Sequence, residues 1–160
     1  MVNVTLICVG KMKEKFYMEA AAEYVKRLAG YCKLNVVELP EQKLPQNPSQ
    51  GEIDGALAKE AEAIRAKIPS GSSLVAMCIE GKMRSSEELA KLLGDWELSS
   101  SKHLVFLIGG SFGLHPSIKQ EAWVKLSMSP MTFPHHLARV MLLEQIYRAF
   151  KIREGSGYHK

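Results

Sequence analysis

The stretch His103-Leu-Val-Phe-Leu-Ile-Gly-Gly-Ser-Phe-Gly113 decides the fold class of this chain. After His103 it continues with five apolar residues, and three glycines follow within five positions. A short uncharged run that ends in glycine predicts a strand buried on both faces, followed by a tight loop. We therefore expect a strand over 103–108 and a loop over 109–113.

This glycine loop is also the first candidate for a ligand site, because glycine lets the backbone approach a ligand closely. Its spacing, G-G-x-x-G, does not match the G-x-G-x-x-G of dinucleotide-binding folds, and the chain has no P-loop motif. Two interpretations stay open. The loop is either a tight turn with no further role, or it holds a nucleotide-like ligand through main-chain groups without phosphate contacts.

Outward from this stretch, strand-like and helix-like runs alternate along the chain. Further strands are expected over 2–9, 34–39, 74–79 and 123–129, and helices over 14–28, 52–68, 85–97, from 116, and over 135–152. Apolar strands that alternate with helices predict an α/β fold: a mostly parallel sheet with helices on both faces, in one domain over 1–160. Such sheets bind ligands at the carboxyl ends of their strands. The loops after residues 9, 79, 108 and 129 are therefore the candidate ligand loops.

Composition narrows the class of protein. The 160 residues are 46% hydrophobic and 24% charged, which is ordinary for a globular soluble chain. No apolar run approaches the roughly 18 residues of a membrane span. The net charge of +4 allows a nucleic-acid partner without requiring one. Cys8, Cys32 and Cys78 are odd in number and form no CxxC, so buried thiols in a reducing cytoplasm are expected.

The helix expected over 135–152 is apolar on nearly every side. Ten of the fourteen residues from Leu137 to Phe150 are apolar or aromatic. Such a helix must be covered on more than one side. A two-fold dimer is the favoured explanation, and a central core helix in a monomer is the alternative. Glu144 and Arg148, four positions apart, are expected to pair with each other or to face the dimer partner.

The histidines and the end of the chain are weaker candidates. His115 and His135 follow two of the candidate loops, whereas the adjacent His135 and His136 are expected to point in different directions. No histidine has a metal-ligand partner at a usual spacing, so no metal is expected. Residues 153–160 are expected to form a flexible tail, although Tyr158-His159-Lys160 could also stack on a base and meet phosphate.

Several blocks spread over the chain resemble one known family. They are Val9-Gly-Lys-Met-Lys-Glu-Lys15, Glu80-Gly-Lys82 with Ser85-Ser-Glu87, Ile108-Gly-Gly-Ser-Phe-Gly-Leu-His115, Met131-Thr-Phe-Pro-His135, Glu144-Gln-Ile-Tyr-Arg-Ala-Phe150 and Tyr158-His159. Together they resemble the bacterial methyltransferases that modify N3 of a pseudouridine in large-subunit (23S) ribosomal RNA, in the SPOUT (α/β-knot) superfamily. The resemblance runs from the first strand to the last residue.

The resemblance implies S-adenosylmethionine as cofactor, a C-terminal trefoil knot and an obligate homodimer. The small size of the chain, with no added RNA-binding domain, leads us to expect the assembled ribosome as substrate. This expectation fits the family. The cofactor positions of the family fall on Met77, Gly109, Met128, Ser129, Pro130, Met131, Thr132 and Phe133. Its catalytic and substrate positions fall on His135, Arg139, Arg148, Tyr158, His159 and Lys160, with the tail expected to come from the other subunit. The N3 proton would pass to His135 or His159, or arginines would favour the anion.

Three residues depart from the pattern of the family. Met77 stands where leucine is common, Phe112 where a small polar residue is often found, and Pro130 removes one backbone donor from the cofactor loop. Two rival functions stay open. One is a SPOUT methyltransferase that acts on another RNA, and the other is a non-catalytic nucleotide-binding module that would tolerate loss of the tail.

Overall fold

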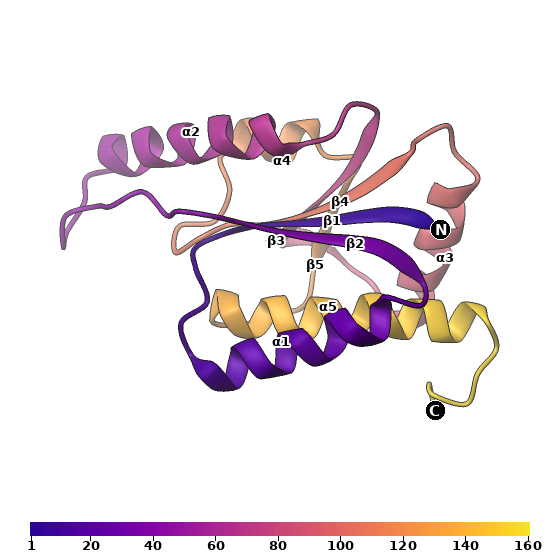
Figure 1. Cartoon of the computed structure of the whole chain (residues 1–160). Coiled ribbons are helices and arrows are strands. Elements are labelled where there is room, and N and C mark those ends of the chain that lie inside the picture. Colours follow the sequence, from indigo (N-terminus) through magenta and orange to yellow (C-terminus); the bar gives the residue numbers. More distant parts are fainter.

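The computed structural model describes residues 1–160 (Figure 1). Five strands and five helices alternate along the chain. They are β1 (Val2–Val9), α1 (Lys15–Leu28), β2 (Cys32–Leu39), α2 (Gln50–Lys67), β3 (Ser72–Met83), α3 (Ser86–Glu97), β4 (His103–Ile108), α4 (Pro116–Glu121), β5 (Val124–Ser127) and α5 (His135–Arg153). The alternation predicted from the sequence is confirmed.

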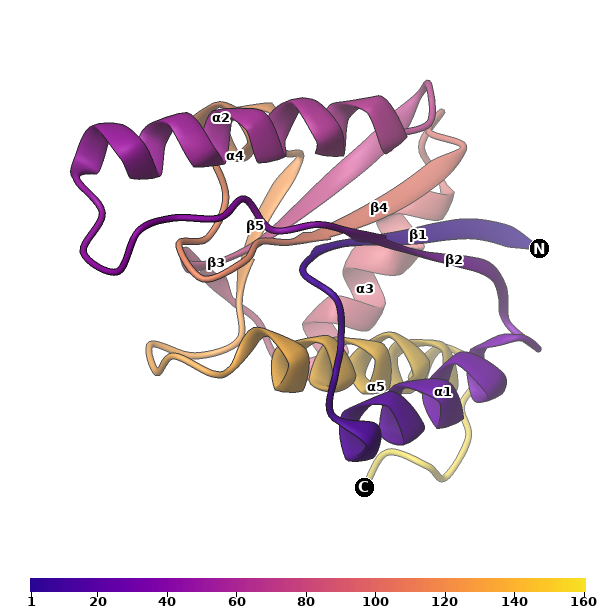
Figure 2. The same cartoon turned by 60° about the vertical axis from the view of Figure 1, so that its left-hand side comes forward.

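The five strands form one sheet in the order β2-β1-β4-β3-β5, and every neighbouring pair is parallel. Helices α2 and α4 cover one face, and α1, α3 and α5 cover the other (Figures 1 and 2). The expected α/β class with helices on both faces is confirmed, and the sheet is wholly rather than mostly parallel. The trefoil knot stays a prediction from the resemblance.

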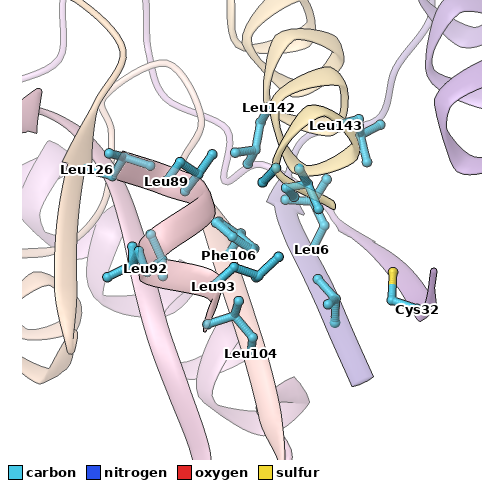
Figure 3. Close-up of a cluster of buried hydrophobic side chains, with 14 of the residues drawn as sticks. Leu6, Cys32, Leu89, Leu92, Leu93, Leu104, Phe106, Leu126, Leu142 and Leu143 are labelled. Carbon is cyan, nitrogen blue, oxygen red and sulfur yellow. The ribbon is translucent and has the colours of Figure 1, made fainter. Parts of the chain in front are cut away.

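Each strand contributes to two cores because its side chains alternate between the faces. In β1, Leu6 and Cys8 belong to the larger cluster under α1, α3 and α5, whereas Ile7 and Val9 belong to the smaller cluster under α2 and α4. Figure 3 shows Leu142 and Leu143 of α5 near Leu6 and Phe106 in the larger cluster. This two-sided burial explains why the strands read as uninterrupted apolar runs.

The helix starts follow from local chemistry. Ser85 and Glu88 form the predicted capping box, in which each side chain accepts a backbone N–H of the other residue. Ser49 and Glu52 form a second capping box, so α2 begins at Gln50, two residues before the predicted start.

Strand boundaries differ from the prediction where β3 passes β5. β3 continues to Met83 instead of ending at Ile79, and its register with β5 shifts between Met77 and Lys82. A Cβ at Gly81 would lie 2.7 Å from the Leu126 backbone, so only glycine permits this close approach. β5 ends at Ser127 because the next residues form a turn.

Helix α5 packs on the sheet between α1 and α3 (Figure 2). Leu142, Leu143 and Ile146 are buried, whereas Leu137, Val140 and Met141 are only half-buried. The chain itself therefore covers one side of α5, and a partner on the other side stays a prediction. None of the five helices combines the length and the apolar run that a bilayer-spanning helix needs.

Candidate active site

A cavity of about 740 Å³ opens at the carboxyl ends of β4 and β5, beside the irregular half of β3. Its wall is built from the segments 77–80, 108–114, 126–129 and 131–135, together with Lys119 and Ala138. The volume lies in the range of small-molecule and cofactor sites. Two of the four loops selected from the sequence, those after residues 108 and 129, therefore meet at one cavity. Residues 77–80 also line it, but they belong to β3, so the loop expected after residue 79 is wrong.

The glycine loop needs glycine for structural reasons as well as for access. A Cβ at Gly109 would overlap the Gly113 carbonyl, and Gly113 itself has φ +79°. The Gly113 N–H donates to the Gly110 carbonyl at 3.0 Å, which closes the turn. The two interpretations left open by the sequence are compatible, because this tight turn is also part of the cavity wall.

Glu41 holds the glycine loop from outside. Its Oε1 accepts the backbone N–H of Ser111 at 2.6 Å, and a Cβ at Gly110 would lie 2.6 Å from the same oxygen. Sequence reasoning missed Glu41, which is 70 positions from Ser111 and lies in the Pro-rich segment 40–48. Its only signal was its position just after the carboxyl end of a strand, since β2 ends at Leu39.

The second loop turns through Ser129. The Ser127 hydroxyl donates to the Ser129 carbonyl at 3.1 Å, and the Ser129 hydroxyl accepts the Met131 N–H at 3.0 Å. Thr132 and Phe133 line the cavity, and so does Met131, although its side chain is 71% exposed. Of the eight cofactor positions implied by the resemblance, Pro130 alone lies outside the cavity lining; the others are Met77, Gly109, Met128, Ser129, Met131, Thr132 and Phe133.

His135 is the titratable side chain of α5 that lines the cavity. Burial, followed by the neighbouring His136, lowers the pKa of His135 below its ordinary value, which favours the uncharged imidazole. The two rings contact each other edge to face with centroids 4.4 Å apart, so the expectation that they diverge is wrong. His136 Nδ1 lies 3.0 Å from Glu14 Oε2, and this contact orients the second ring.

Arg139 lies behind this wall and does not line the cavity. Its side chain is buried and is bound to the Glu38 carboxylate and the Gly10 carbonyl. Phe112, by contrast, lines the cavity and is 48% exposed, so it lies at the entrance.

The remaining predicted residues gather at the other end of α5. Arg148 donates to Glu144 at 2.6 Å, lies 4.8 Å above the Tyr158 ring and is 3.1 Å from His159 Nδ1. His159 Nε2 is 2.7 Å from Glu87. The tail expected to be flexible instead folds back on α3 and α5, because these polar and aromatic contacts hold it there.

The predicted site residues therefore form two groups within the chain. One group lines the cavity and includes His135. The other contains Arg148, Tyr158 and His159, and it lies outside the cavity lining. Lys160 ends the chain as an exposed residue.

His115 belongs to neither group, because its Nδ1 accepts the Ser117 N–H at 3.1 Å and caps α4. No three His, Cys, Asp or Glu side chains converge in a way that could hold a metal ion.

Comparison with known proteins identifies the family. The family model described as "Predicted SPOUT methyltransferase" matches residues 2–159. The chain is 50% identical over 158 residues to the ribosomal RNA large subunit methyltransferase H of Clostridium novyi (strain NT), and the match covers 99% of both proteins. A relative from Methanococcus vannielii is 49% identical at the same coverage, and its name assigns that activity provisionally. The parallel sheet, the cavity at its strand ends and these matches agree, and the chain belongs to the SPOUT methyltransferase family.

Proposed function

We propose that the protein transfers a methyl group from S-adenosylmethionine to N3 of a pseudouridine in large-subunit ribosomal RNA. It does so in the cytoplasm, as a homodimer, on the assembled ribosome. The observation that carries the proposal is the position of His135 on the wall of a cofactor-sized cavity in a chain of the SPOUT methyltransferase family.

The cavity suits the methyl donor in size and in chemistry. It is lined by the glycine loop, whose glycines present only backbone groups, by residues 126–129, and by apolar residues such as Met77, Ile108 and Phe133. A base edge and a ribose are recognised by backbone donors and acceptors next to apolar surface. When bound, S-adenosylmethionine supplies a methyl group that is already activated by the positive charge on its sulfur.

The contribution of the chain is positioning and proton transfer. The cavity wall excludes water and aligns the nucleophile with the methyl group, which lowers the entropic barrier of a displacement. The N3 imide of pseudouridine must lose a proton to become the nucleophile. His135 accepts this proton because it is half-buried on the cavity wall and its lowered pKa favours the uncharged ring, whereas His159 lies against Glu87 and Arg148.

The second group of residues forms the RNA side of the site. Arg148 and Lys160 supply positive charge for phosphate, and Tyr158 supplies a ring on which a base can stack. Because these residues lie outside the cavity lining, a two-fold partner is needed to bring one subunit's tail beside the other's cavity. The half-buried Leu137, Val140 and Met141 of α5 are the apolar surface for that partner.

The test combines substrate form with a catalytic variant. S-adenosylmethionine labelled in its methyl group is incubated with ribosomes that lack the modification and, separately, with naked ribosomal RNA. We expect label in the ribosomes alone, mapped by mass spectrometry to N3 of one pseudouridine. His135→Asn should lower kcat about 100-fold, the scale of general base catalysis, with little change in donor Kd.

His103→Asn is the matched control, because His103 begins β4 and so lies at the end of that strand opposite the cavity. It should leave kcat and donor Kd unchanged. Label in naked RNA alone would mean that the substrate is free ribosomal RNA and not the assembled ribosome. Tight donor binding with no label in either preparation would show that the protein is a non-catalytic nucleotide-binding module.

A further inference from the structure

Arg139 is a buried cation that no step of the proposed reaction uses. Its exposed fraction is 3%, and an arginine guanidinium stays protonated in proteins. Nη1 donates to Glu38 Oε2 at 2.5 Å, and Nη2 donates to the Gly10 carbonyl at 3.0 Å. Its Nε is also buried and has no hydrogen-bond partner.

These contacts connect three segments that are distant in sequence. Glu38 lies near the carboxyl end of β2, and its Oε2 also accepts the Met12 N–H at 3.0 Å. The Gly10 N–H donates to the Leu39 carbonyl at 2.6 Å. Arg139 therefore ties the first turns of α5 to the end of β2 and to the loop after β1.

The same contacts define the place of His135. Arg139 is four positions after His135, so both side chains project from the same face of α5. Gly10 lies against the imidazole, because a Cβ at Gly10 would be 3.4 Å from His135 Nε2. Arg139 thus holds both the helical turn that carries His135 and the backbone on which the ring rests.

Stability alone does not account for this arrangement. A buried ion pair is often replaceable by apolar side chains without loss of stability, since desolvation offsets much of the attraction. The unpartnered Nε shows that the guanidinium is not fully satisfied. By contrast, Arg153 binds Glu97 through both terminal nitrogens at the other end of α5, with both side chains partly exposed.

We infer that Arg139, held by Glu38, is a positioning residue that fixes the His135 imidazole on the wall of the methyl-donor cavity. The inference rests on the proposed function, in which His135 accepts a proton. It differs from the RNA contact implied for Arg139 by the family resemblance. An RNA contact would set the KM for ribosomes, whereas a positioning role sets kcat.

The electrostatic surroundings of His135 provide a second readout. The charged or titratable groups around the ring are His136, Glu41, Arg139 and Glu14, and Glu38 is bound to Arg139. The positive charge of Arg139 opposes protonation of His135. Removing that charge while Glu38 stays should therefore raise the pKa of His135, and keeping the charge in a lysine should not.

The experiment uses the full-length protein with Arg139→Lys, Arg139→Met and the matched control Arg153→Lys. We measure kcat and KM on ribosomes, the Kd of S-adenosylmethionine by calorimetry, the pH dependence of kcat and the thermal midpoint. The pKa of His135 is followed by NMR titration of the folded protein. The thermal midpoint shows whether each variant is folded at the assay temperature.

Arg139→Lys should lower kcat at least about 10-fold, because small misplacements of a catalytic group are costly. Its KM for ribosomes and its donor Kd should change less than about twofold. The acidic limb of its pH profile of kcat should keep its position. Arg139→Met should lower kcat similarly and move the acidic limb and the NMR pKa of His135 upward. Arg153→Lys should lower the thermal midpoint without changing kcat.

Three results would overturn the inference. They are full kcat in folded Arg139→Lys, an effect confined to the KM for ribosomes, and equal loss of kcat in Arg153→Lys. If the wild-type protein transfers no methyl group, the proposed function is wrong. The NMR titration then decides the Arg139–His135 coupling, and an unchanged pKa in Arg139→Met rejects it.

Discussion

The carboxylate of Glu41 accepts a hydrogen bond from the backbone N–H of Ser111 at 2.6 Å. This contact joins the segment after β2 to the loop after β4, and those two strands are separated by β1 in the sheet. The same carboxylate occupies the space that a side chain at Gly110 would need. The Pro-rich segment 40–48 is therefore part of the support of the cavity and not only a connection between β2 and α2.

The first prediction tests this support. Gly110→Ala should weaken S-adenosylmethionine binding a few-fold, because the new Cβ meets Glu41 Oε1 at 2.6 Å and pushes the carboxylate away from the Ser111 N–H. Glu41→Ala alone should also weaken binding a few-fold through loss of one hydrogen bond. In the double variant, removal of the carboxylate should relieve the clash, so the two effects should not add. Calorimetry on all four proteins measures the coupling, and strict additivity would reject the proposed contact.

The second prediction concerns the thiols. Burial raises the pKa of Cys8 to about 12 and that of Cys32 to about 11, and both side chains are almost fully buried. Cys78 is more exposed and lines the cavity. A maleimide at about pH 8.5 should therefore modify Cys78 first, since only the thiolate reacts. Peptide mass spectrometry identifies the site.

Bound S-adenosylmethionine should slow that modification, because it fills the space beside Cys78. Cys78→Ser serves as the control and should remain unmodified in the folded state. Equal rates with and without a saturating donor would mean that the donor binds elsewhere.

The third prediction concerns the tail. Tyr158 and His159 lie outside the cavity lining. His159→Ala, and deletion of residues 158–160, should therefore lower kcat on ribosomes about tenfold or more while donor Kd stays within about twofold. Calorimetry and the methyl-transfer assay separate the two quantities. Weakened donor binding with normal turnover would contradict the proposal, and full activity without the tail would show that the tail is not part of the site.

The fourth prediction concerns acid stability. Partial burial raises the pKa of Glu38, but hydrogen bonds from the Met12 N–H and Arg139 outweigh it, so the pKa lies below its ordinary value in the folded protein. A carboxyl group with a lowered folded-state pKa stabilises the protein above its unfolded-state pKa of about 4.5. This contribution is lost as the pH falls through the folded-state pKa.

Glu38→Gln should therefore lower the free energy of unfolding at pH 7 by about 1–3 kcal/mol, the scale of charge-assisted hydrogen bonds. The difference from the wild-type protein should shrink as the pH approaches 3. Urea denaturation at several pH values measures both. Glu97→Gln, near the far end of α5, provides a second carboxyl group for comparison, because Arg153 lowers the pKa of Glu97 in the same way. A difference that is constant with pH would show that the Glu38 charge is not the cause.

Much of the fold could be predicted because it depends on local sequence patterns. The apolar runs at 2–9 and 103–108 are strands over those ranges, and Ser85 with Glu88 starts α3 as expected. Among the boundaries that moved, those of β3 and β5 depend on the shifted pairing between these two strands. A pairing register between distant segments leaves no mark in either segment alone.

The candidate site divides in the same way. Glycines after a buried strand, and a proline-bounded loop before a helix, identified the cavity-forming loops and led to His135. Glu41 and Glu38 were missed because their partners, Ser111 and Arg139, are 70 and 101 positions away. The side chains of all four are ordinary polar groups in an expected element or loop, and nothing in the neighbouring sequence marks their partners.

The sequence by itself thus determined the alternation of elements and the two-faced burial of the strands, because both depend on residue type and short-range periodicity. It also indicated the family, through motif blocks spread over the chain that resemble it. Only the tertiary structure decided that the loops after β4 and β5 share one cavity. It also decided that His135 lines that cavity while Arg139 stays behind it. The physical reason is that the order and register of parallel strands bring their carboxyl ends together, and this order is a property of the whole packed sheet.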